Sequence, residues 1–373
     1  EARGRSMLNG FPVVNAGVTK VRELAATVNK PVIALTGTSF PKLTGEICYA
    51  GGFTGYLGSG IPYTTSYTKE TSVAEGIRNY QYLDRLVARY TEMGVELHRR
   101  QPGFLTGTNI PPCIAIAIGI ADALLAAAQG VKQYGLELGQ CLHLIQDAVA
   151  IEVSNSLTQE YLRAKGYVDV FTTVTSLHWM GAWPTDRAQS FGLMVYGGFA
   201  GAVGGAVSVT TKSVAEAMGL PTPEENAEGL RATRMGVYLA RNVKLNELPE
   251  YQREKEVLEA EVRSIVDKIL EVGDGDVAIG TMRALEAGLL DVPWSPNREC
   301  KSALMPARDG DGYLRMVDTG ALPFPDHINT YHRERLQNMA EQSGKAYGPD
   351  LAIDSVYELT EDLGTLMPNI GNP

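Results

Sequence analysis

Short hydrophobic runs, rich in β-branched residues, alternate along the chain with longer segments whose hydrophobic residues recur at helical spacing. Helical spacing is clearest over residues 75–94 and 114–131. The strand-like runs are SMLNGF (6–11), PVIALTGT (31–38), VELHRRQPGFLTGT (95–108), YGLELGQ (134–140), DVFTTVT (169–175) and AVSVTTK (206–212). Nearly continuous hydrophobic strands separated by helices predict a parallel sheet that is covered on both faces.

The repeat of roughly 35 residues per strand–helix unit is typical of a (β/α)8 barrel of the TIM type, which needs eight such units. The pattern shows only six strands. Either the sheet is open and doubly wound, or two units of a barrel precede Glu1. The chain begins with EARGRSMLNG rather than with methionine, so we expect its natural N-terminus to lie upstream.

The composition of the chain changes at about residue 276, where prolines and turn sequences become frequent. We therefore predict an α/β catalytic domain over 1–275 and a C-terminal α+β extension over 276–373, near the mouth of the barrel. Within the extension, DGDGYLRMVDTG (309–320) begins like a calcium loop but lacks the terminal glutamate, which favours a hairpin. In the first domain, YLGSGIPYTTSY (56–67) predicts an irregular loop because it contains two glycines and a proline.

The uncharged segment 191–209 is long enough to cross a membrane. Its glycines and its β-branched end instead favour a closely packed helix followed by a buried strand. No signal peptide opens the chain, and four scattered cysteines without a CxxC pair indicate reduced thiols in a cytoplasmic protein. The net charge of -10 disfavours a nucleic-acid partner. The five histidines show no zinc-binding pattern, so we expect no metal site.

Functional residues of a barrel follow the carboxyl ends of its strands, and this rule selects Arg99 and Lys212. Glu216 follows Lys212 by four residues, in the expected first turn of a helix, where the two side chains share one face. An ammonium beside a carboxylate can bracket a vicinal diol such as a ribose. On spacing alone, an ordinary exposed ion pair on the helix is the favoured explanation of the two residues.

Several long motifs resemble one family, the large (epsilon, or E) subunit of glutamate mutase, also called methylaspartate mutase. They are MLNGFP (7–12), FLTGTNIPPC (104–113), ALLAAAQGVK (123–132), NSLTQEYLRAKGYVDVF (155–171), HWMGAWPTD (178–186), TTKSVAEAMGLPTPEENAEGLRATRM (210–235) and GDVAIGTMRALEAGLLDVP (275–293). The resemblance implies a TIM barrel whose first two strands precede Glu1. It also implies adenosylcobalamin as cofactor, held largely by a small partner subunit with a DxHxxG motif that this chain lacks. Two large subunits would form a homodimer within a heterotetramer.

The resemblance also implies which residues contact the cofactor. Lys212 and Glu216 match the pair that holds the ribose of adenosylcobalamin. Asn9 and Met180 match positions near the adenosyl group, where Tyr357 replaces a phenylalanine. Radical chemistry at such a group needs a closed, dry cavity.

Tyr63 and Tyr67 match the substrate-binding tyrosines of the family. By contrast, Leu35 replaces an arginine that grips a substrate carboxylate, and Leu57 replaces a glutamate that binds the amino group. We therefore expect a glutamate-like substrate whose carboxylate or amine is masked, for instance by a carrier-protein thioester or an amide. Alternatively, the segment before Glu1 supplies the charges and glutamate itself is rearranged.

Two other classes of function remain open at this point. A non-catalytic barrel would keep the fold without the chemistry, although the Lys212 and Glu216 match speaks against it. An acid–base lyase on the same barrel would need paired catalytic carboxylates or a base–nucleophile pair at the strand ends, and the sequence shows neither.

Overall fold

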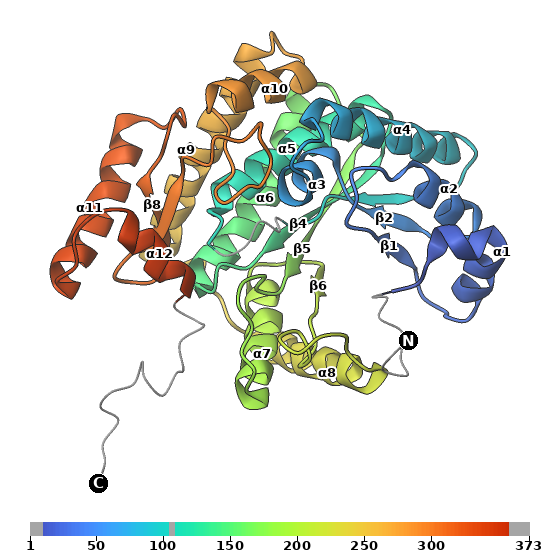
Figure 1. The fold of residues 1–373 in the computed structure, drawn as a ribbon, viewed down its shortest axis with the longest axis horizontal. Helices are drawn as coiled ribbons and strands as arrows, with labels where there is room; N and C mark the ends of the chain where they lie inside the picture. Colours follow the sequence, from blue (N-terminus) through green and yellow to red (C-terminus); the bar gives the residue numbers. More distant parts are fainter. Residues whose placement is uncertain (1–9, 104–108, 358–373) are drawn as a thin grey trace.

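A computed structural model describes residues 10–103 and 109–357, with the side chain of Tyr357 excepted. Its main sheet has six parallel strands in sequence order and curls into half of a barrel (Figure 1). These strands are β1 Ile33–Leu35, β2 Gly55–Leu57, β3 His98–Arg100, β4 Gln133–Gly139, β5 Phe171–Leu177 and β6 Ser208–Thr210. Within the described part of the chain β1 and β6 each pair on one side alone, so the sheet has two free edges.

Five of the six predicted strands are confirmed, but the prediction of an irregular loop over 56–67 is wrong. That segment contains the end of β2, which the hydrophobic pattern did not reveal, and helix α3, Gly60–Tyr67. Its glycines serve close packing, because a Cβ on Gly60 would lie 2.6 Å from the backbone of Gly76 in the neighbouring helix. The expected first strand, 6–11, lies mostly outside the described residues, and its last two residues are not in a strand.

Helices cover the outer face of the sheet (Figure 1). Next to the first four strands lie α1 Val13–Ala26, α2 Lys42–Ala50, α4 Val73–Glu92 and α5 Pro112–Ala128. Next to the last two lie α6 Leu144–Ala164 and α7 Arg187–Val203, and α7 packs on α8 Pro223–Ala240. Helix α5 is hydrophobic on all sides because α9 Pro249–Val272 and α10 Val277–Ala287 cover it from outside.

The region 309–320 forms a hairpin, as predicted, between the antiparallel strands β7 Met305–Arg308 and β8 Leu314–Asp318. Helices α11 Asp326–Ser343 and α12 Pro349–Tyr357 pack against this hairpin. Since α10 contacts α4, α5 and α9 of the preceding region, the domain boundary at residue 276 stays a prediction.

Segment 191–209 forms most of α7 followed by β6, which confirms a helix and a strand, although β6 is half-buried rather than buried. None of the described helices is long and hydrophobic enough to span a membrane. The four cysteines are unpaired, and Cys300 alone is only partly buried.

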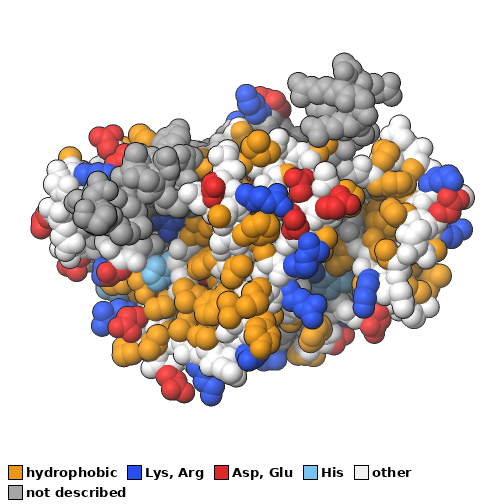
Figure 2. Space-filling model, turned by 90° about the horizontal axis from the view of Figure 1, so that it is seen from below, with side chains coloured by type: hydrophobic (Ala, Val, Ile, Leu, Met, Phe, Trp, Pro, Cys, Tyr) orange, Lys and Arg blue, Asp and Glu red, His pale blue; other side chains and the backbone are white. Residues whose placement is uncertain are grey.

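Seen from below, hydrophobic side chains gather near the middle of the surface (Figure 2). Among the exposed large hydrophobic residues of the protein, Leu230, Met235 and Tyr238 belong to helix α8. The face of α8 that points away from α7 is therefore not covered by any described residue.

Candidate functional site

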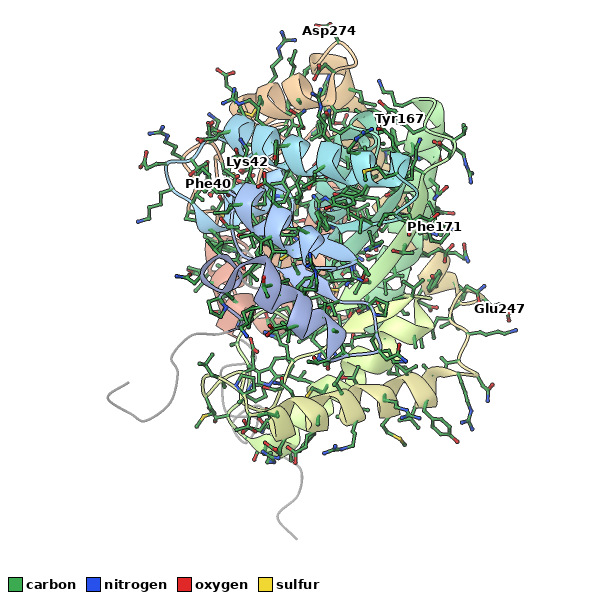
Figure 3. All side chains as sticks on the ribbon, turned by 90° about the vertical axis from the view of Figure 1, so that its right-hand side faces the viewer. Phe40, Lys42, Tyr167, Phe171, Glu247 and Asp274 are labelled. Atoms are coloured by element: carbon green, nitrogen blue, oxygen red, sulfur yellow. The ribbon has the colours of Figure 1, made fainter. Side chains whose placement is uncertain are left out.

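The carboxyl ends of all six strands lie along one edge of the sheet, because the strands are parallel. Figure 3 separates the two edges: Phe40 and Lys42, which follow β1, lie on one side, and Phe171, which begins β5, lies on the other. The sequence-predicted residues at positions 35, 57, 63, 67, 180, 212 and 216 all follow or end strands at the carboxyl edge. The fold thus places residues that are up to about 180 positions apart in the chain along the same edge of the sheet.

Lys212 and Glu216 form an ion pair just after β6. Glu216 lies in a hydrogen-bonded turn that follows Lys212, and the next helix, α8, starts only at Pro223, so the prediction of a first helical turn is wrong. The turn still brings the two side chains together, because Glu216 N donates to Ser213 O at 3.2 Å. The Lys212 side chain is 9% exposed, whereas that of Glu216 is 40% exposed, so the carboxylate stays accessible to a ligand.

Aromatic residues from the loop after β5 hold Lys212 in place. Its Nζ lies 5.4 Å from the ring centroid of Trp183, within the range of a cation–π contact. Trp183 stacks on His178 at 6.4 Å between centroids, and His178 Nδ1 accepts the Lys212 backbone N–H at 3.3 Å. Burial, together with the nearby Lys212 charge, lowers the pKa of His178 to about 4, so this imidazole is neutral at pH 7.

Helix α3 presents Tyr63 and Tyr67 at the end of β2. Their ring centroids lie 5.6 Å apart, with Tyr63 buried and Tyr67 half-exposed. A Cβ on Gly37 would lie 3.7 Å from the ring of Tyr67, which places this ring beside the end of β1. Burial raises the pKa of both phenols above the ordinary value, so both are neutral donors and acceptors at pH 7.

Leu35 and Leu57 are partners in the sheet register, yet their environments differ. Leu57 is 3% exposed and Leu35 is 65% exposed. The expected closed, dry cavity around both residues is therefore not present in the described part of the chain. The reason is that β1 is an edge strand, and Leu35 lines an open groove of about 490 Å³ between β1 and α1.

Met180 lines a small cavity of about 30 Å³, together with Gln140 and Trp179. This cavity lies between the ends of β4 and β5 and helix α6, so Met180 is at the carboxyl edge as expected. Asn9 and the side chain of Tyr357 lie outside the described residues. Their expected places near the cofactor stay predictions.

Arg99, which the strand-end rule selected, does not face the site. It is buried on the outer face of the sheet, where Nε donates to Asp84 Oδ1 of α4 at 2.7 Å. Its two terminal nitrogens donate to Tyr56 O at 2.8 Å and Gly58 O at 2.9 Å. The next residue, Arg100, lies on the concave face, because side chains alternate along a strand. Arg99 is thus structural.

Sequence reasoning missed the charged pair on the concave face, Arg100 and Glu137. Arg100 Nη1 lies 4.0 Å from Glu137 Oε1. The carboxylate is held by neighbours, since Thr210 Oγ1 donates to Oε1 at 2.5 Å and Gly103 N donates to Oε2 at 2.9 Å. Burial raises the pKa of Glu137 and lowers that of Arg100, so desolvation outweighs their mutual attraction. A carboxylate within the hydrophobic run YGLELGQ was the available signal.

The sequence matches a family model described as methylaspartate mutase E chain over residues 1–367. The chain belongs to the methylaspartate mutase E chain family. This membership identifies it as a member of an isomerase family and confirms the resemblance seen in the motifs.

Curated relatives agree with this family. The glutamate mutase epsilon subunit of Desulfitobacterium hafniense is 41% identical over 95% of this chain and 74% of its own length. The subunit of the same name from Treponema denticola is 40% identical over 96% of this chain and 74% of its own. A third, from Haloarcula marismortui, is 40% identical over 95% of this chain and 72% of its own. The similarity thus extends over nearly all of this methylaspartate mutase E-type chain.

Proposed function

We propose that this chain is the catalytic large subunit of an adenosylcobalamin-dependent radical mutase of the glutamate mutase type, which rearranges the carbon skeleton of a modified, glutamate-like substrate. One observation carries the proposal. The Lys212–Glu216 pair is kept at the end of β6, while the ends of β1 and β2 carry leucines. The pair that the resemblance assigns to the ribose is thus present, whereas leucines stand at the two positions that the resemblance assigns to charged contacts with the amino acid.

The residues at the end of β6 fit a ribose. The ammonium of Lys212 only donates hydrogen bonds and the carboxylate of Glu216 only accepts them, so together they match the two hydroxyls of a vicinal diol. Trp183, whose buried Nε1 has no hydrogen-bond partner among the described residues, adds an indole face beside them. When bound, adenosylcobalamin supplies the carbon-centred radical that removes a substrate hydrogen atom and later returns it.

The rest of the site positions the substrate. The neutral phenols of Tyr63 and Tyr67 hold its polar groups through hydrogen bonds without adding charge. Losing one charge-assisted contact costs about 1.5–3 kcal/mol, and the leucines at 35 and 57 remove two of them. Free glutamate therefore binds weakly, and a substrate with a masked carboxylate or amine, such as an amide or a carrier-protein thioester, binds better.

The remaining parts of the enzyme follow from the family. The proposed full fold is a (β/α)8 barrel, completed by two strands next to the free edges of β1 and β6. The corrin is held largely by a small subunit with a DxHxxG motif, and two large subunits pair within a heterotetramer. Asn9, Met180 and Tyr357 lie near the adenosyl group.

The experiment combines the chain with a cobalamin-binding small subunit and adenosylcobalamin. Electron paramagnetic resonance should detect cob(II)alamin coupled to an organic radical when a glutamate amide or thioester is added. Glutamate in the same assay tests the alternative that the substrate is unmodified. No radical with any glutamate derivative contradicts catalysis and leaves the non-catalytic barrel.

A binding assay tests the nucleoside pocket independently of turnover. Glu216→Gln should weaken the affinity of the assembled complex for adenosylcobalamin but not for methylcobalamin, which has no adenosyl group. Equal weakening of both cobalamins, or of neither, would show that Glu216 does not bind the ribose.

A further inference from the structure

Three residues at the ends of neighbouring strands form a row on the concave face. Leu35 of β1 is in register with Leu57 of β2, which is in register with Arg100 of β3. Neighbouring strands of a sheet lie about 4.8 Å apart, so the three side chains are adjacent. The row therefore joins two hydrophobic side chains to one guanidinium, at the level where the substrate is proposed to bind.

The guanidinium of Arg100 lacks hydrogen-bond acceptors among the described residues. None of its N–H groups forms a hydrogen bond with a described residue, and Nε is buried. Its nearest anion, Glu137 Oε1, is 4.0 Å from Nη1, beyond hydrogen-bond distance. Both oxygens of that carboxylate already accept hydrogen bonds from Thr210 and Gly103. With a side chain 15% exposed, Arg100 holds donors that an incoming acceptor can reach.

The other arginine of β3 shows what a structural arginine looks like in this protein. Arg99 is 1% exposed, and its three donor nitrogens reach Asp84 and the carbonyls of Tyr56 and Gly58 within 2.9 Å. Buried donors are normally paired in this way. The unpaired donors of Arg100 therefore indicate a site for a ligand rather than a contact that supports the fold.

The surroundings keep Arg100 in place. A Cβ on Gly135 would lie 3.2 Å from Arg100 Cγ and 2.8 Å from His98 Cε1, so this glycine makes room for both side chains. Burial and the neighbouring arginines lower the pKa of His98 to about 4, so it adds no charge to the concave face at pH 7. Glu137, fixed by its two donors, faces the guanidinium from the next strand, β4.

We propose that Arg100 binds a free carboxylate of the substrate, and that Leu35 and Leu57 face an uncharged part of the same molecule. This proposal rests on the proposed mutase function and narrows its substrate class to glutamate-like acids with one free carboxylate and one masked one. A carboxylate fits the planar fork of a guanidinium through two parallel hydrogen bonds. Arg100 is thus the specificity-determining cation. From β3 it takes over the role of the arginine that Leu35 replaces on β1, two strands away.

The test measures binding to the full chain without cofactor by isothermal titration calorimetry. The probes are glutaric acid monoamide, which has one carboxylate, and glutaramide, which has none. The unchanged protein should bind the monoamide at least about tenfold more tightly than the diamide, since a charge-assisted pair is lost with the second probe. Arg100→Met should remove this ratio, and Arg100→Lys should keep only part of it.

Controls separate binding from a structural role. Arg234→Met, on the exposed face of α8, makes the same chemical change away from the sheet and should leave the ratio unchanged. Glu137→Gln removes the neighbouring charge but keeps Arg100, so the monoamide should bind at least as tightly as before. If Glu137→Gln and Arg100→Met lose binding equally and both lower the melting temperature, the pair is structural and the proposal fails.

The two proposals fail in different ways. Equal binding of both probes to the unchanged protein, or binding of neither, overturns the role of Arg100 whatever the radical assay shows. Discrimination that depends on Arg100, together with no radical signal in the assembled complex, overturns the mutase function and leaves the carboxylate site standing.

Discussion

A carboxylate placed at position 57 tests the geometry of the concave face directly. Leu57 is 3% exposed and in register with Arg100, whose guanidinium donates no hydrogen bond to a described residue. Leu57→Glu loses the burial of a leucine, worth about 1.5–3 kcal/mol, and adds the cost of desolvating a carboxylate. Pairing with Arg100 returns about 1.5–3 kcal/mol, because both partners are charged.

The free energy of the interaction between the new carboxylate and Arg100 can be isolated by a double-mutant cycle. The free energy of unfolding is measured by urea titration for the unchanged chain, Leu57→Glu, Arg100→Met and the double variant. We expect a coupling energy of about 1.5–3 kcal/mol, so Leu57→Glu is much more damaging when Arg100 is absent. Leu57→Gln keeps the shape without the charge, so its cycle retains at most a hydrogen bond to the guanidinium and should give a smaller coupling than the Leu57→Glu cycle.

A coupling below about 0.5 kcal/mol for Leu57→Glu would show that Arg100 does not face position 57. The placement of Arg100 on the concave face would then be wrong. The same variant carries a second readout: a carboxylate at 57 should compete with glutaric acid monoamide and weaken its binding about tenfold or more.

Two further predictions concern the supports of the site. In a urea titration, Gly60→Ala should destabilise the protein by more than about 2 kcal/mol and displace α3, since the new Cβ would lie 2.6 Å from the Gly76 backbone. Gly192→Ala is the control, because Gly192 lies in α7 with open space around it. In the same titration it should be neutral or stabilising by up to about 1 kcal/mol. Folding lowers the pKa of His178 from 6.5 to about 4, so between these pH values the folded chain binds fewer protons at this residue than the unfolded chain does. The contribution of His178 to stability is therefore complete above pH 6.5 and is lost as the pH falls from 6.5 to 4. His178→Gln should therefore flatten the decrease in urea midpoint between pH 7 and pH 5, and an unchanged slope would mean that this imidazole is not buried in its neutral form.

Much of the site could be located from the sequence. The strand-end rule and the family motifs placed Lys212, Glu216 and Met180 at one edge of a parallel sheet, and the structure brings them to that edge. These inferences hold because hydrophobic periodicity and chain order are local properties, and the parallel arrangement follows from strands that alternate with helices.

The segment 56–67 could not be predicted correctly, because its glycines have a tertiary cause. Gly58 leaves room for the rings of Tyr63 and Tyr80, and Gly60 allows α3 to touch α4, whereas the sequence alone shows only residues that disfavour regular structure. Similarly, Leu35 and Leu57 look equivalent in the sequence. Only the position of β1 at the free edge makes one of them exposed and the other buried.

The sequence by itself determined the α/β class with parallel strands and the family of this protein, whereas β2, and with it the full order of the strands, came only from the structure. The sequence also determined that Arg99 and Arg100 face opposite sides of β3, since side chains alternate along a strand. The tertiary structure alone decided which of these two arginines points toward the site. Asp84 of α4 binds Arg99 on the outer face, and the curl of the sheet leaves Arg100 on the concave face, where no described residue accepts a hydrogen bond from it.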